Sequence, residues 1–111
     1  MTKIRKVIGN ELAKFMLSNP DDVVIVKFGA PWCGPCRVLE GVLENLNPSR
    51  IPGCQIVEVD VEEDDNAALS DEFNIRNIPV LVFTRNGHEL ARIVGNTSAE
   101  SIYKKIDELR G

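Results

Sequence analysis

The chain has 111 residues, of which 43% are hydrophobic and 27% charged, a balance typical of a folded domain rather than a disordered chain. Thirteen basic and seventeen acidic residues give a net charge of −4, which argues against a nucleic-acid interface and against a polybasic membrane patch. No apolar run is long enough to span a membrane, and no unbroken apolar segment follows the basic start. We therefore expect one domain over residues 1–111, located in the cytoplasm.

The first part of the chain predicts a strand, a helix and a second strand. Residues 4–8 predict a short edge strand, and Asn10 is placed to cap a helix that ends at Asn19-Pro20. The helix carries apolar residues on one face: Leu12, Phe15 and Met16. Residues 23–28 are β-branched and nearly all apolar, which is typical of a strand covered on both faces.

The middle of the chain predicts a long helix, a strand and a short helix. The long helix begins around Cys33 and ends at Asn47-Pro48. Its expected apolar side consists of Val38, Leu39, Val42, Leu43 and Leu46. Residues 55–61 predict the next strand, and the acidic run 62–65 predicts a solvated loop at the start of a short helix. That helix carries Leu69 and Phe73 four residues apart.

The last part of the chain predicts a hairpin and a closing helix. Residues 79–84 and 89–94 flank Asn86-Gly87, the strongest short-range hairpin signal. Residues 97–100 form a capping-box pattern that opens a helix. This helix directs three apolar residues to the core: Ile102, Ile106 and Leu109. The order βαβαβαββα predicts an α/β fold with a central mixed, mainly parallel sheet flanked by helices, to which the hairpin adds an antiparallel edge.

The residues that carry chemistry are Trp32-Cys33-Gly34-Pro35-Cys36, which lie between a buried strand and a helix. A thiol attacks only as thiolate, and the free N–H groups at a helix start favour an anion, so we expect a lowered pKa for Cys33. Cys36 lies one turn further on the same side, near enough for a disulfide. Gly34 would permit the tight entry into the helix, and Pro35 suits its first turn. The pattern therefore predicts a redox-active pair.

Two alternatives concern the cysteines. The first alternative is that Cys33 and Cys36 provide two of the four ligands of a zinc site. The chain offers only Cys54 and His88 as further ligands, and it has no second C-x-x-C motif. Because His88 follows the hairpin turn, we expect it to point to solvent. Cys54 is interpreted as an inert small hydrophobic residue, with a regulatory or dimerising thiol as the alternative.

The chain resembles the thioredoxin family. The resemblance rests on the Trp-Cys-Gly-Pro-Cys motif, on Ile78-Pro79 before the hairpin and on Val94-Gly95 at its end, and it covers essentially the whole chain in the family's element order. It implies the thioredoxin fold and a reaction. The Cys33 thiolate attacks a target protein's disulfide, and Cys36 then attacks the Cys33 sulfur, which releases the reduced target.

The resemblance also implies a substrate groove and a set of partners. Trp32, Ile78, Pro79 and Gly95 would form an apolar rim around the sulfur, with Pro79 cis rather than an ordinary trans proline, and the Ile78 backbone would pair with an extended substrate. No cofactor would be bound. A flavin-containing thioredoxin reductase would supply electrons from NADPH. Because no long apolar edge strand or exposed apolar stripe stands out in the sequence, we expect a monomer. The alternatives are an oxidase or isomerase of the same fold, and a binding module that acts without redox chemistry.

The sequence departs from the family pattern beneath the cysteines. Lys27 stands where the family usually has a buried Asp, and Glu58 stands where its Lys partner usually lies, so the charges of the pair are exchanged. We hypothesise that Glu58, directly or through a water, takes the proton of Cys36 while Lys27 stabilises thiolates. The alternative is that Lys27 directs its ammonium group to solvent.

Two glycines mark further departures. Gly41 replaces a proline that kinks the long helix in many members of the family, which leaves the shape of this helix open. Gly29 replaces a second tryptophan, so that Trp32 is the only indole in the chain.

Overall fold

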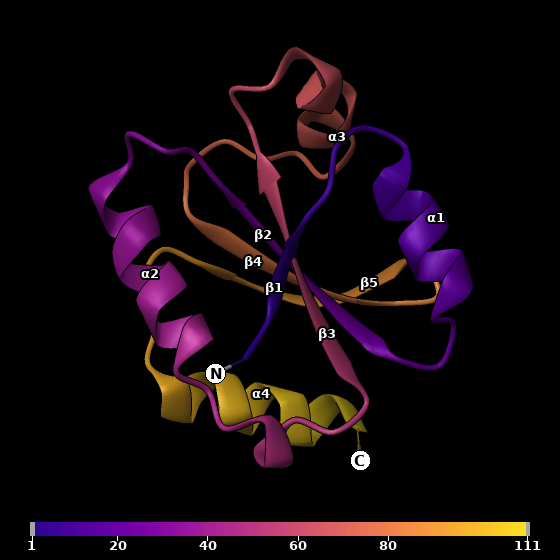
Figure 1. Cartoon of the computed structure of the whole chain (residues 1–111), viewed down its shortest axis with the longest axis vertical. Helices are drawn as coiled ribbons and strands as arrows, with labels where there is room; N and C mark the ends of the chain where they lie inside the picture. The colour runs from indigo at the N-terminus through magenta and orange to yellow at the C-terminus, as the bar shows by residue number, and fades with distance from the viewer. Residues whose placement is uncertain (1, 111) are drawn as a thin grey trace.

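The computed structural model describes residues 2–110, which form a five-stranded sheet with helices on both faces (Figure 1). The strands are β1 (Ile4–Lys6), β2 (Val23–Gly29), β3 (Cys54–Asp60), β4 (Val80–Arg85) and β5 (His88–Val94). The helices are α1 (Glu11–Ser18), α2 (Gly34–Glu44), α3 (Ala67–Glu72) and α4 (Ala99–Arg110), with single 3₁₀ turns at Pro48–Arg50 and Asp64–Asn66. Each predicted strand and helix is present, with ends that differ from the predicted ones by a few residues.

The strands lie in the order β1-β3-β2-β4-β5, which puts β2 at the centre. β1 and β2 both run parallel to β3, whereas β4 runs antiparallel to β2 and β5 antiparallel to β4. The hairpin turns at Asn86 and Gly87, whose φ angles of +50° and +82° match the left-handed turn that joins twisted strands. The predicted mixed sheet with an antiparallel hairpin is confirmed, with two parallel and two antiparallel strand pairs rather than mainly parallel ones.

The sheet carries a separate apolar cluster on each face. Every residue of β2 is buried, and successive side chains alternate between the two faces. Ile25 packs into a cluster with Leu43 of α2 and Ile106 of α4. Val26 packs into a second cluster with Leu12 of α1, which Phe73 at the end of α3 also joins. In Figure 1, α2 and α4 accordingly lie on one side of the sheet, and α1 and α3 on the other.

One predicted core position on α2 is wrong. Val38 is 60% exposed, whereas Leu39 and Leu43 are fully buried. Adjacent helical residues point about 100° apart, so the stripe formed by the two leucines leaves Val38 on the solvent side. Leu46 is buried as predicted, but it follows the helix rather than belonging to it.

Two predicted helix caps also differ from the structure. The α4 cap lies at Ser98, whose Oγ accepts a hydrogen bond from Ser101 N at 3.1 Å, one residue later than the capping-box pattern predicts. Asn10 precedes α1 but makes no side-chain bond to it, because its backbone is already close to helical. Instead the Glu11 carboxylate accepts a bond from Ile8 N at 2.7 Å.

None of the helices in residues 2–110 is long and apolar enough to cross a membrane.

Candidate active site

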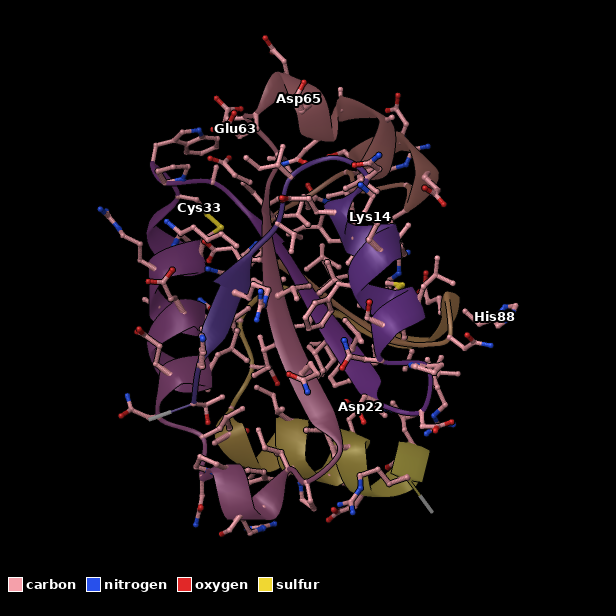
Figure 2. All side chains as sticks on the ribbon, turned by 45° about the vertical axis from the view of Figure 1, so that its right-hand side comes forward. Lys14, Asp22, Cys33, Glu63, Asp65 and His88 are labelled. Carbon is pink, nitrogen blue, oxygen red and sulfur yellow. A yellow bond between two sulfur atoms is a disulfide. The ribbon has the colours of Figure 1, made fainter. Side chains whose placement is uncertain are left out.

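The two cysteines of the C-x-x-C motif lie where β2 ends and α2 begins, and a disulfide joins them (Figure 2). Cys33 is the cap residue of α2, with extended backbone, and its Cα is 5.2 Å from that of Cys36. Cys33 Sγ accepts a hydrogen bond from Cys36 N at 3.2 Å, and Pro35 occupies the first turn of the helix. The predicted pairing is therefore present, and a helix N–H group is directed at the sulfur predicted to ionise.

The sulfurs lie just beneath the surface. Cys33 is 5% and Cys36 1% exposed, and both pack against Ala30, with Val61 and Ile78 at the edge of this small cluster. Trp32 precedes the pair and is 66% exposed.

The predicted reason for Gly34 is wrong. Its φ lies outside the left-handed region, and a Cβ there would meet no atom within 4 Å. The entry into the helix therefore does not require glycine at this position.

The segment before β4 reaches the cysteines from another part of the chain. The Ile78–Pro79 peptide bond is cis, as the family resemblance implied. Gly95 N donates a hydrogen bond to Pro79 O at 2.8 Å, which holds the two ends of the hairpin together. The structure thus brings Ile78 to the cysteines and Gly95 to Pro79, although these residues are distant in sequence.

Beneath the cysteines lies the charge-exchanged pair. Lys27 and Glu58 are register partners on the parallel strands β2 and β3, and Lys27 Nζ donates to Glu58 Oε2 at 2.9 Å. Lys27 is only 3% exposed, so its ammonium group does not point to solvent. A buried ammonium requires a partner, and the exchange of both charges supplies one.

A cavity of about 350 Å³ adjoins this pair and is lined by Cys36, Lys27, Glu58 and Gly29 among others. Gly29 lets the end of β2 approach Cys36 closely, because a Cβ there would stand only 3.1 Å from Cys36 Sγ and 3.6 Å from Lys27 Cε. Cys36 therefore lies beside a cavity whose lining includes the charged pair Lys27 and Glu58.

The sequence reasoning missed Glu40, which also lines this cavity. Glu40 Oε2 lies 3.5 Å from Lys27 Nζ, and its side chain is 42% exposed. Glu40 follows Cys36 by four residues and therefore lies on the same face of α2, a spacing that the sequence already contains.

The residues considered for a zinc site do not gather at the cysteine pair. Cys54 pairs with Val23 at the far end of β2, and His88 lies on the hairpin away from Cys33 (Figure 2). Within the range 2–110, no three His, Cys, Asp or Glu side chains are grouped so that they would hold a metal ion. Cys54 is half-buried, and this burial raises the pKa of its thiol.

Comparison with known proteins places these features in one family. A family model described as Thioredoxin matches residues 6–108. The thioredoxin of Haemophilus influenzae is 40% identical over 77 residues, which are 69% of this chain and 70% of that protein. Thioredoxin 2 of Chlorobaculum tepidum is 36% identical over 90 residues, 81% of each protein.

Solved structures agree with the fold. The thioredoxin of Fasciola hepatica has a TM-score of 0.81 at 28% identity, over 94% of this chain and 97% of that one. Spinach chloroplast thioredoxin f, at 20% identity, shares the fold with a TM-score of 0.85, over 98% of this chain and 88% of that one. With its Cys33–Cys36 disulfide at the start of α2, the chain belongs to the thioredoxin family and is a thiol–disulfide oxidoreductase.

Proposed function

We propose that the chain is a monomeric protein-disulfide reductase of the cytoplasm. The observation that carries the proposal is the position of the Cys33 sulfur at the start of α2, with Cys36 N–H directed at it. A donor in this place stabilises a thiolate, and a thiolate is the form that attacks a disulfide.

In the proposed reaction two electrons pass from the cysteine pair to the target. The Cys33 thiolate forms a bond to one target sulfur while the target disulfide breaks, and the other target sulfur leaves and takes up a proton. Cys36 then loses its proton and bonds to the Cys33 sulfur, which releases the second target sulfur. The product is the Cys33–Cys36 disulfide.

We further propose that an extended target segment pairs with the backbone of Ile78, beside Trp32, Pro79 and Gly95. The large exposed surface of Trp32 and the contact of Ile78 with the cysteine cluster support this placement. Backbone pairing accepts many target sequences, since it reads main-chain groups rather than side chains.

The cycle requires re-reduction of the Cys33–Cys36 disulfide. We propose a flavin-containing thioredoxin reductase as the partner, with NADPH as the source of electrons. The chain itself would bind no cofactor.

The test is the reduction of insulin by dithiothreitol, with and without the protein. The wild-type chain should accelerate precipitation of the insulin chains, and Cys33→Ser/Cys36→Ser should not. NADPH consumption in the presence of a thioredoxin reductase then tests the partner. Wild-type protein that fails to accelerate insulin reduction would refute the reductase assignment, and preferential oxidation of dithiols would indicate an oxidase instead.

We propose Glu58 as the proton acceptor of Cys36, because it lies in the cavity that Cys36 also lines and is only 15% exposed. Glu58→Gln removes the acceptor while keeping the shape, so resolution of the mixed disulfide should slow by about tenfold or more. The first attack by Cys33 should change less. Stopped-flow Trp32 fluorescence separates the two steps, and equal effects on both would contradict this role.

A further inference from the structure

We propose that Glu40 is a positioning residue that competes with Glu58 for the ammonium group of Lys27 and thereby makes the Cys33–Cys36 pair a stronger reductant. This inference rests on the proposed function of the pair. It concerns a carboxylate on α2, outside the Lys27–Glu58 exchange.

The geometry places one cation between two carboxylates. Lys27 Nζ lies 2.9 Å from Glu58 Oε2 and 3.5 Å from Glu40 Oε2. The first carboxylate is mostly buried on β3, whereas the second is 42% exposed on α2. The interaction of Lys27 with Glu40 is therefore more strongly screened by water and salt than its interaction with Glu58.

The stem of the same lysine lies near Cys36. A Cβ on Gly29 would be 3.1 Å from Cys36 Sγ and 3.6 Å from Lys27 Cε. The sulfur and the lysine stem therefore both lie within van der Waals distance of this one position. Glu40 lies one helical turn beyond Cys36, so the pull of its carboxylate on the ammonium group would be directed along α2 rather than towards the sulfur.

Four further charged side chains line the cavity. They are Lys6 on β1, Arg37 on α2, Asp60 on β3 and Glu63 in the segment after β3. With Lys27, Glu40 and Glu58 they amount to three cations and four anions, so the site does not have a surplus of positive charge for a thiolate.

The consequence for the reduction potential follows from Coulomb's law. Reduction of the disulfide by dithiothreitol breaks the Cys33–Cys36 bond and forms the cyclic disulfide of the reagent. Of the two protons that dithiothreitol gives up, one binds to Cys36 and one enters solvent when Cys33 remains a thiolate. A carboxylate near the sulfurs repels the negative charge of the Cys33 thiolate, and it also pairs with Lys27, which could otherwise stabilise that thiolate. Both effects disfavour the reduced form.

The experiment measures the equilibrium of the protein with reduced and oxidised dithiothreitol at pH 7 by Trp32 fluorescence. Glu40→Gln should shift the equilibrium towards reduced protein by about two- to fivefold, since a partly exposed pair is screened by water. The shift relative to wild type should shrink when the salt concentration is raised, because ions screen an exposed carboxylate.

Glu44→Gln is the matched control. It removes the same charge from the same helix, one turn further from the cysteines, and Glu44 does not line the cavity. It should leave the equilibrium unchanged. An equal shift in both variants, or no shift in Glu40→Gln, would overturn the role of Glu40. Wild-type activity with insulin would still support the reductase assignment in that case, so the two failures are distinguishable.

Discussion

The three cysteines differ in their surroundings, and each environment has a different effect on the thiolate. Cys33 receives a helix N–H group, and Cys36 is buried behind it. Cys54 lies half-buried at the start of β3, where desolvation raises the pKa of its thiol, while Arg110 and Arg85 only partly offset this effect. A thiolate is therefore expected at Cys33 and not at Cys54.

Alkylation of the reduced protein tests this difference in reactivity between Cys33 and Cys54. At pH 7, iodoacetamide should modify Cys33 more than about tenfold faster than Cys54, because the reaction follows the thiolate fraction. The rate at Cys54 should continue to rise with pH beyond 9.0, the ordinary pKa of a thiol, because its raised pKa delays ionisation. Mass spectrometry of the labelled peptides gives both rates, and Cys54→Ser isolates the fast site. Comparable rates at pH 7 would contradict a thiolate at Cys33.

Among the elements, α2 positions the cysteine pair, since Cys33 is its cap residue, Cys36 lies in its first turn and Glu40 lies on the same face as Cys36. The helix is continuous over Gly34–Glu44, and Gly41 lies inside it. A Cβ at Gly41 would meet no atom within 4 Å, and its φ is not in the left-handed region. Glycine in this place therefore weakens the helix without a steric reason visible in the fold.

Gly41→Ala should accordingly stabilise the protein by about 0.5–1 kcal/mol, because alanine loses less backbone freedom on folding. Urea unfolding followed by far-UV circular dichroism measures the change. Gly87→Ala is the control. It also has open space, but its φ of +82° disfavours a side chain, so it should destabilise the protein. Destabilisation by Gly41→Ala would mean that α2 needs glycine for a bend.

In the whole molecule, two apolar clusters share a single sheet. Leu43 belongs to the cluster under α2 and α4, and Leu12 to the one under α1 and α3. Because β2 contributes side chains to both clusters, neither can lose its packing while the other keeps an intact sheet. The fold should therefore unfold as one cooperative unit.

Leu43→Ala and Leu12→Ala test this coupling from opposite faces. Each removes a side chain that is at most 2% exposed and should lower the free energy of unfolding by about 2–5 kcal/mol. In each variant the urea midpoints from Trp32 fluorescence and from circular dichroism should coincide. Two separated transitions in either variant would show that the clusters unfold independently.

Much of the fold was predictable because its signals are local. Asn86-Gly87 predicts the hairpin through backbone conformation alone, and the unbroken apolar run 23–28 predicts a strand covered on both faces. The redox pair was predictable for the same reason, since the spacing of Cys33 and Cys36 sets their distance on a helix. The sequence pattern predicted the wrong residue where packing or one hydrogen bond decides between adjacent positions. Examples are Val38 as a core residue and the cap of α4.

The sequence by itself determined the order of elements, the cysteine pair at a helix start and, through its resemblance to a family, the exchanged charges of Lys27 and Glu58. Only the tertiary structure decided that Lys27 turns inward, that a cavity adjoins Cys36 and that Glu40 is a second partner of the lysine. The physical reason is that helical spacing and turn conformation depend on adjacent residues. The side-chain contacts of a buried charge depend instead on how separate elements pack together.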